Sequence, residues 1–335
     1  MSSLLVSGSL AFSSSLVLTA VLARVAPRLS WGDGPTLARK LQDRPVPPVG
    51  GAAILCGATT AWLATGFGAP FGLAPAAVLA SLVLAFAVGT LDDMRVGGLG
   101  ALAKLALQAA ATLPLAVAAA LRLGEGAAES LAVLALAVLA ALAAMNLANT
   151  FDHADGALGG ISTLGLLLAG DGAPAGALAG FLPWNLDARP GRRSAPTAYL
   201  GDAGSHLVGL LLLLHPPAWP VFLLPALDLA RLAVVRNHAG SKPWVGDRRH
   251  VSHLLAASGL SPRRVVLRLL GASAPACAGA LLARGLSSPW FVAPGLFASA
   301  LAYARMVRAG GREAMPAAGP AQKHLGACPS PAGGE

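Results

Sequence analysis

Eleven runs of apolar residues, separated by short polar segments, constrain the fold of this chain more than any other feature. A helix needs about 20 apolar residues to cross the hydrocarbon core of a bilayer, and only 12% of the residues are charged. The runs span residues 4–23, 49–66, 74–91, 99–121, 131–148, 158–169, 173–184, 200–215, 219–235, 265–282 and 290–304. The sequence therefore predicts an all-α, polytopic integral membrane protein with about 10 to 11 transmembrane helices.

Basic residues predict the orientation of these helices. With the N-terminus outside, the inner segments are 24–48, 92–98, 149–157, 185–199, 236–264 and the tail from 305. Of the 24 Lys and Arg residues, only Arg122 and Arg284 then lie at outer ends. The positive-inside rule supports this topology, with a cytoplasmic C-terminus, and it also accounts for the net charge of +9. No basic patch typical of nucleic-acid binding is evident in the sequence.

Four runs, at 158–169, 173–184, 200–215 and 290–304, are short for a full span. We expect the first two to form a helical hairpin with Asp171 at its tip. If they formed one span instead, every later loop would lie on the opposite side of the membrane. We predict one transmembrane domain over residues 1–308. The tail from 309 to 335 is rich in Ala, Gly and Pro and is expected to be disordered. Three scattered cysteines indicate neither a disulfide framework nor a zinc site.

Polar clusters occur where apolar runs meet the predicted inner loops. Asp92 and Asp93 end one run, and Lys104 and Gln108 follow on one face of the next. Paired carboxylates can hold magnesium or position a phosphate, and a lysine inside an apolar helix is a functional candidate. The alternatives are solvated end groups for the aspartates and snorkelling for Lys104.

Two further acidic clusters follow on later runs. One has Asn146, Asn149, Asp152 and Asp155 at a spacing of three, and the other is Gly201-Asp202 with neighbouring glycines. Oxygen ligands of this kind suit a hard cation, and a helix N-terminus suits a phosphate. Tyr199 could stack on a base. Helix capping is the structural alternative for both clusters.

The last large inner loop carries Arg248, Arg249, His250 and His253. Clustered cationic groups favour pyrophosphate binding, and a solvated juxtamembrane loop is the alternative. Zinc is not expected at these histidines, because no cysteine is near and no third ligand is evident in the sequence. In the preceding run, Asp228 and Arg231 are at helical spacing, and we expect a structural ion pair, because an unpaired charge there is costly.

Taken in order, these motifs resemble the polyprenyl-phosphate N-acetylhexosamine-1-phosphate transferases of glycosyltransferase family 4, which include the phospho-MurNAc-pentapeptide translocase. The resemblance covers about residues 39 to 265, and five motifs in the family order make it specific. The motifs are Arg39 to Gly51, Leu91-Asp92-Asp93 with Lys104 and Gln108, Asn146 to Gly160, Gly180 to Asn185 with Leu200 to Ser205, and Asp228 with Arg236 and Asp247 to His253. The histidine loop is similar to the branch that uses small UDP-N-acetylhexosamines.

The resemblance implies transfer of a sugar-1-phosphate from a UDP-sugar to polyprenyl (undecaprenyl) phosphate, with release of UMP, at the cytoplasmic face of a bacterial inner membrane. It implies Mg²⁺, with Mn²⁺ as the alternative, and it is consistent with a homodimer. The implied residues are Asp202 and Asn149 for the metal; Lys104, Arg249, His250 and His253 for phosphate oxygens; Asp155, Asn185, Tyr199 and Arg44 for uridine; and Asp92 and Asp93 for the lipid phosphate. Direct attack is the expected mechanism, and a covalent intermediate at Asp92 or Asp152 is the alternative.

The chain departs from the family pattern at two positions. Ser252 stands where that branch usually has histidine, and His153 where the second motif usually has glycine. A weakly active relative that serves as a scaffold or regulator is therefore a second hypothesis. A transporter of an anionic solute is a third, although it predicts charges near the bilayer midplane. A CDP-alcohol phosphotransferase would concentrate its aspartates in one compact motif.

Overall fold

Twelve α-helices make up the computed structural model, which describes residues 2–29, 45–68, 70–95, 97–186, 196–240 and 249–314. They are α1 (Ser2–Val25), α2 (Gly50–Thr65), α3 (Pro75–Met94), α4 (Ala101–Leu123), α5 (Ala127–Phe151), α6 (Ala157–Ala169), α7 (Gly172–Asn185), α8 (Gly201–Leu213), α9 (Leu223–His238), α10 (Val251–Ala257), α11 (Pro262–Gly285) and α12 (Val292–Ala314). Within these ranges no strand is formed, so the predicted all-α class is confirmed.

Each of the eleven apolar runs forms a helix, and α10 is the additional one. Seven helical segments in the described chain are long and apolar enough to cross a membrane. They begin at α1, α3, α4, α5, η3 (Pro216–Phe222, continuing into α9), α11 and η4 (Pro289–Phe291, continuing into α12). The chain is therefore a multi-pass membrane protein. Helices α2, α6 and α8 are apolar but shorter, at 16, 13 and 13 residues.

Two expectations about length need correction. The run at 290–304 is part of a 23-residue helix, because α12 continues through Arg305 and Arg308 to Ala314. The helix thus also passes the expected domain boundary at 309, while residues 315–335 lie outside the described part. The predicted hairpin of α6 and α7 is present, and the Asp171 side chain at its tip accepts a hydrogen bond from the Ala173 backbone N–H (3.1 Å).

Helix α8 lies at the centre of the bundle and packs against α2, α3 and α5. Its side chains from Ala203 to Leu212 are buried. The crossing with α3 is close because Gly89 has no side chain: a Cβ there would lie 2.4 Å from Ala203 Cα. Small residues allow transmembrane helices to approach to backbone contact. This crossing brings the end of α3 beside the start of α8.

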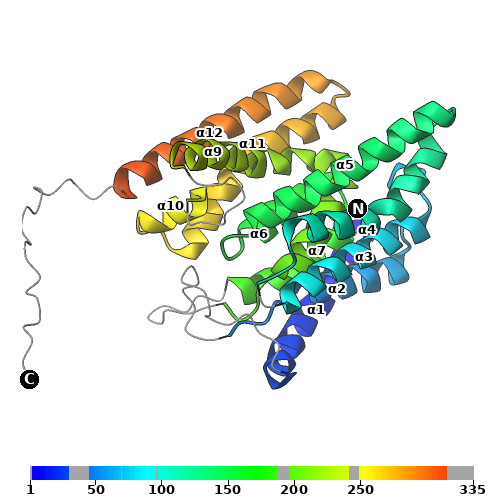
Figure 1. Ribbon diagram of the computed structural model, residues 1–335, viewed down its shortest axis with the longest axis horizontal. Coiled ribbons are helices and arrows are strands. Elements are labelled where there is room, and N and C mark those ends of the chain that lie inside the picture. The colour runs from blue at the N-terminus through cyan, green and yellow to red at the C-terminus, as the bar shows by residue number, and fades with distance from the viewer. Residues whose placement is uncertain are drawn as a thin grey trace, which may run out of the picture.

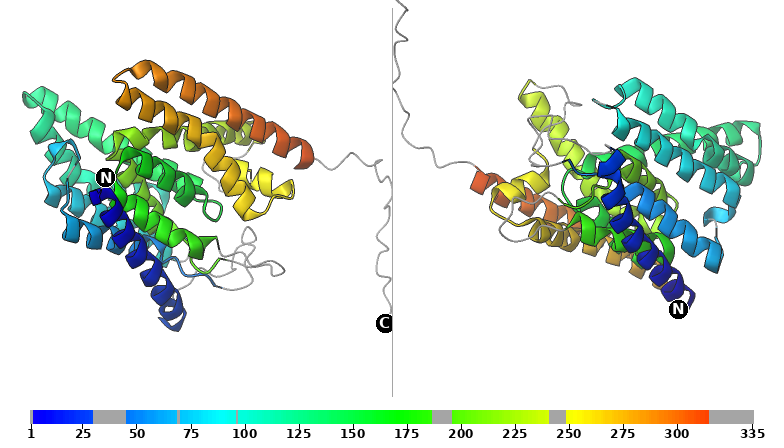
Figure 2. Two further views of the ribbon diagram at one scale, coloured as in Figure 1. Left: turned by 180° about the vertical axis from the view of Figure 1, so that it is seen from behind. Right: turned by 90° about the horizontal axis from the view of Figure 1, so that it is seen from below.

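The later helices lie along one side of the molecule. Helices α11 and α12 pack as a pair, α12 also contacts α9 and α10, and α11 contacts α6 (Figures 1 and 2). Helix α1 packs on α7 and α2 at the other side (Figure 2). The short α10, which carries the histidine motif, is thereby held against α12.

Candidate active site

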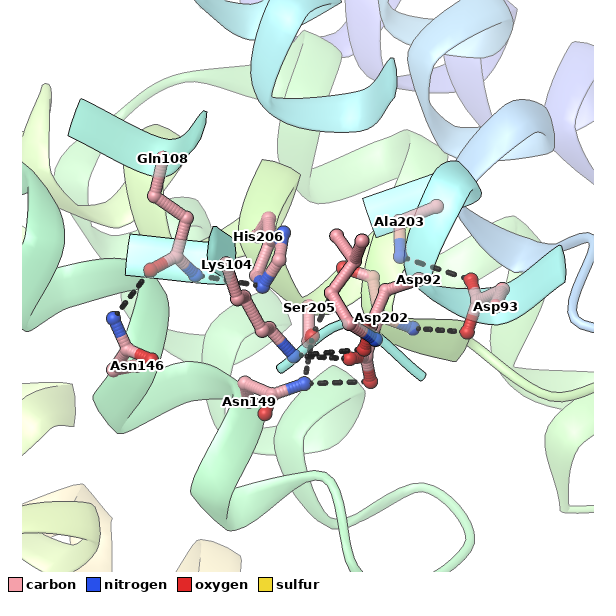
Figure 3. Close-up of polar contacts among 11 residues, drawn as sticks. Asp92, Asp93, Lys104, Gln108, Asn146, Asn149, Asp202, Ala203, Ser205 and His206 are labelled. Atoms are coloured by element: carbon pink, nitrogen blue, oxygen red, sulfur yellow. Dashed lines mark hydrogen bonds and ion pairs between the residues drawn. The ribbon is translucent and has the colours of Figure 1, made fainter. Parts of the chain in front are cut away.

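A lysine between two carboxylates forms the centre of the first polar cluster (Figure 3). Lys104 Nζ, from α4, donates to Asp92 Oδ2 at 3.0 Å and also to Asp202 Oδ2. Asp92 ends α3 and also accepts a hydrogen bond from the Leu99 backbone N–H. The side chains of Asp92, Lys104 and Asp202 are 12%, 16% and 28% exposed, respectively. The ions are thus largely desolvated, yet a ligand can still reach them.

Amide side chains extend this cluster into the protein. Asn149 Nδ2 donates to Asp202 Oδ1 (2.7 Å) and to Ser205 Oγ (3.0 Å). One turn deeper, the Gln108 amide contacts His206 Nε2 (2.9 Å) and accepts from Asn146 Nδ2 (2.8 Å), as Figure 3 shows. These hydrogen bonds fix the side chains of α4, α5 and α8 relative to one another. Asn149, predicted for the site, thus lies beside Asp202, whereas Asn146 contacts Gln108 one turn deeper.

Asp93 has a different task from its neighbour Asp92. Its two carboxylate oxygens accept hydrogen bonds from the backbone N–H groups of Asp202 (2.9 Å) and Ala203 (3.1 Å). These are among the first N–H groups of α8, which have no partner inside the helix. Asp93 therefore caps α8 from another helix and sets the position of Asp202. Both of its oxygens are engaged by this contact.

Gly201 permits this cap and provides a testable prediction. Its φ is +75°, and a Cβ would lie 2.6 Å from Asp93 Oδ2 and 2.8 Å from Pro48 Cβ. A positive φ costs a non-glycine residue about 1–3 kcal/mol before any clash. We expect Gly201→Ala to lower the melting temperature and to displace Asp202. Thermal unfolding in detergent checks this, with Gly271→Ala as control, because that helical glycine has open space around it. Equal melting temperatures for Gly201→Ala and the unsubstituted protein would contradict the assignment.

The loop after α5 adds two more carboxyl groups. Burial, together with the negative charges of Asp202, Asp155 and Asp93, raises the pKa of Asp152 well above its ordinary value. Burial raises the pKa of Asp155 to about 7. The first acidic cluster and this loop thus form one region of mutually repelling carboxylates. A bound cation would relieve that repulsion.

Asn185 holds this loop in place. Its Oδ1 accepts from the Gly156 backbone N–H (2.6 Å), and its Nδ2 donates to the Ala198 carbonyl (3.0 Å). The side chain is 4% exposed. Both ends of the amide thus join the loop after α5 to the segment before α8, which gives Asn185 a positioning role at the predicted uridine site.

A second cluster surrounds the histidine motif. His250 Nδ1 lies 2.9 Å from Asp228 Oδ2, and Asp228 Oδ1 accepts from Arg231 (3.0 Å), from the Tyr303 hydroxyl (2.9 Å) and from the Val251 backbone N–H (3.2 Å). The predicted Asp228–Arg231 ion pair is confirmed, and it is part of this larger network. Asp228 is 1% exposed, so α9 holds the start of α10 through a buried carboxylate.

The remaining predicted residues are placed as follows. His253 lies with its ring centroid 6.1 Å from that of His250. Arg249 is exposed, and its carbonyl accepts a hydrogen bond from Arg231. The Tyr199 backbone carbonyl accepts from Gly50 N–H (2.9 Å), so this tyrosine lies at the junction of α2 and α8. Arg44, with Arg39, Lys40, Asp247 and Arg248, lies outside the described residues.

Three contributors to the site were missed from the sequence. His206 is one turn beyond Asp202 on α8, where spacing alone could have placed it on the same face. Tyr303 comes from α12, 75 residues after Asp228, and nothing local links the two. His153 was noted only as a departure from the family pattern, yet its ring stacks on His250 with centroids 3.9 Å apart.

The residues present fit a magnesium ion. Asp92 Oδ2 and Asp202 Oδ2 both contact the one ammonium group of Lys104, so two anionic oxygens converge on a single cation position. Carboxylate and amide oxygens are the ligands that Mg²⁺ prefers, usually through one or two carboxylates plus substrate phosphates. Asp202 and Asp92 would hold the ion, with Asn149 beside them.

A multi-pass membrane protein with a carboxylate–lysine cluster at the ends of three helices, and a histidine cluster beside it, has the layout of a membrane enzyme for phosphate chemistry. Comparisons with known proteins agree with this class. Residues 75–215 match the family described as Glycosyl transferase family 4. The chain belongs to this family, because its match to a relative from Yersinia pestis extends over most of both proteins.

The undecaprenyl-phosphate alpha-N-acetylglucosaminyl 1-phosphate transferase of Yersinia pestis is 30% identical over 327 residues, covering 84% of this chain and 85% of that protein. The Escherichia coli K12 protein of the same name is 31% identical, over 41% of this chain and 45% of that protein. The alignment thus spans less than half the length of that relative. The decaprenyl-phosphate N-acetylglucosaminephosphotransferase of Mycolicibacterium smegmatis is 28% identical, over 68% of this chain and 70% of that protein.

Proposed function

We propose that this protein transfers N-acetylhexosamine-1-phosphate, most simply N-acetylglucosamine-1-phosphate, from a UDP-sugar to a polyprenyl phosphate in the membrane. The products are polyprenyl-diphospho-sugar and UMP. The observation that carries the proposal is the convergence of the Asp92 and Asp202 carboxylates on the Lys104 ammonium group, which shows that their oxygens can share one cation. The names of the relatives supply the substrate classes.

In the proposed reaction, a phosphate oxygen of the lipid attacks the sugar-linked phosphorus of the donor. The new P–O bond forms as the bond to the UMP oxygen breaks. Both reactants are anionic, so the site must offset negative charge. A bound Mg²⁺ would polarise the phosphoryl oxygens and neutralise charge that develops on UMP. Lys104, Arg249, His250 and His253 would donate to phosphate oxygens.

Direct attack fits the site better than a covalent aspartyl intermediate. The second pKa of a phosphate monoester is about 6, so the lipid phosphate is mostly dianionic at pH 7 and needs little deprotonation. Asp92 already accepts from Lys104 and Leu99, which lowers its nucleophilicity. Asp152, whose raised pKa favours the protonated form, is a weak nucleophile too. Asp93 acts as a positioning residue in this proposal, because its oxygens cap α8.

Topology belongs to the proposal as well. We place the protein in the inner membrane of a bacterium with the site facing the cytoplasm, where UDP-sugars are made. The positive-inside pattern supports this side. A protease-accessibility or cysteine-labelling map of the loop at 249–250 tests it: labelling from the periplasmic side of intact cells would contradict the orientation.

The test of the activity is UMP release by detergent-purified protein. We expect release with Mg²⁺, undecaprenyl phosphate and one member of a UDP-sugar panel, and loss of release when EDTA is added. Omission of the lipid should also abolish release, which separates transfer from hydrolysis. A folded preparation that releases no UMP with any donor would refute the proposal and favour the scaffold role.

A further inference from the structure

Three imidazoles gather beside the end of α5. His153, in the loop after α5, stacks on His250 with ring planes inclined by 22° and centroids 3.9 Å apart. The ring of His253 has its centroid 5.5 Å from that of His153. His153 is about 100 residues from the other two in sequence, so only the fold brings the rings together. The proposed transfer reaction gives no role to His153.

Hydrogen bonding determines which nitrogen of His153 carries the proton. Its Nδ1 lies 2.9 Å from the Thr150 carbonyl oxygen, which can only accept, so Nδ1 donates. Nε2 then bears a lone pair. This atom is shielded from solvent and has no hydrogen-bond partner among the described residues. An orphaned buried acceptor is costly unless a ligand satisfies it.

His250 shows the same arrangement. Its Nδ1 lies 2.9 Å from Asp228 Oδ2, and the other oxygen of that carboxylate accepts from Arg231 and Tyr303, so Nδ1 donates. Its Nε2 bears the lone pair when the ring is neutral. Metal-binding histidines almost always donate their second ring N–H to a carboxylate or a backbone carbonyl in this way. Both rings thus carry the outer contacts that such ligands have.

One ligand atom from each of His153, Asp228 and His250 lies within 4.8 Å of the other two. We propose that His153 and His250, with His253 as the third imidazole and Asp228 orienting His250, bind a divalent transition-metal ion of the zinc class. Imidazole nitrogens select zinc, cobalt, nickel or copper, whereas Mg²⁺ prefers oxygen ligands. This site is therefore chemically separate from the carboxylate cluster around Asp202.

Binding requires a small rearrangement. A metal ion lies in the plane of each ligating ring, so the stacked rings must splay by side-chain rotation to share one ion. Three imidazoles leave a fourth zinc position open, as in catalytic zinc sites. Since His250 is also a proposed phosphate contact, its Nε2 cannot serve both the ion and a phosphate oxygen at once.

The test measures metal binding, so it does not depend on transferase activity. Protein purified in detergent through an affinity tag without histidines is titrated with Co²⁺, whose visible absorption reports nitrogen ligation, and with Zn²⁺ by calorimetry, both in excess Mg²⁺. The variants are His153→Phe, which keeps an aromatic ring on His250, and Asp202→Asn, which alters the carboxylate cluster. His238→Ala is the matched control, since His238 is an exposed histidine on α9.

We expect one equivalent of Co²⁺ to bind in the unsubstituted protein, in Asp202→Asn and in His238→Ala, with affinity at least about tenfold lower in His153→Phe. If His153→Phe does not yield folded protein by thermal melting, His153→Asn replaces it. The absence of saturable binding, equal affinity in the His153 variants, or loss of binding only in Asp202→Asn would overturn the proposal. Failure of the UMP-release assay would leave this result unaffected.

Discussion

Replacing Asp202 by asparagine is expected to reduce UMP release by roughly 10³-fold or more, about 4 kcal/mol of transition-state stabilisation. Asp202 Oδ2 contacts Lys104, and its Oδ1 accepts from Asn149, so the carboxylate is the point where α4, α5 and α8 meet. Asparagine keeps the size of the side chain but removes its charge. The proposed metal position then retains Asp92 as its single close carboxylate.

The Asp202 variant must be distinguished from a misfolded one. Its melting temperature in detergent should stay near that of the unsubstituted protein, and the Mg²⁺ concentration needed for half-maximal activity should rise. Glu129→Gln is the matched control, because it also removes one carboxylate charge, at an exposed helix start away from the site. Activity in Asp202→Asn within a few fold of the unsubstituted protein would contradict a metal-binding role.

Local features of the sequence predict the helices and some near neighbours. The apolar runs identify eleven of the twelve helices, since a helix satisfies its own backbone hydrogen bonds in lipid. Helical spacing predicts the Asp228–Arg231 pair, whose members are three residues apart. The distribution of Lys and Arg predicts that Asp92 and Asp202 lie at the same end of the bundle. In the structure both carboxylates contact Lys104.

Long-range contacts were not predictable in the same way. The hydrogen bonds between Asp93 and the start of α8 join residues 109 and 110 positions apart. They depend on the crossing of α3 and α8, which small residues such as Gly89 bring to backbone distance. The pattern of apolar residues identifies which face of each helix packs, but it does not predict which other helix that face contacts. Asp92 and Asp93 are identical in type and adjacent, so only the tertiary structure separates a site residue from a cap.

Replacing Asp228 by asparagine is expected to be the most destabilising single change, at about 3–5 kcal/mol. Asp228 is 1% exposed and accepts hydrogen bonds from side chains on α9 and α12 and from the start of α10. Asparagine leaves the Arg231 charge without its partner and turns an N–H₂ group toward one of these donors. The melting temperature in detergent should fall by several degrees, and UMP release should fall as His250 loses its orientation.

The chain contains a second aspartate–histidine pair that serves as the control for this change. Asp171 Oδ2 lies 2.7 Å from His215 Nε2, at the tip of the α6–α7 hairpin, and the Asp171 side chain is 26% exposed. Asp171→Asn keeps a good helix-capping residue, and partly exposed ion pairs contribute only about 0–1 kcal/mol, so its melting temperature should change little. If the two variants have the same melting temperature, the buried hydrogen bonds of Asp228 are not what holds α10 against α9 and α12. If only Asp228→Asn is destabilised, the histidine motif owes its position to that one buried carboxylate.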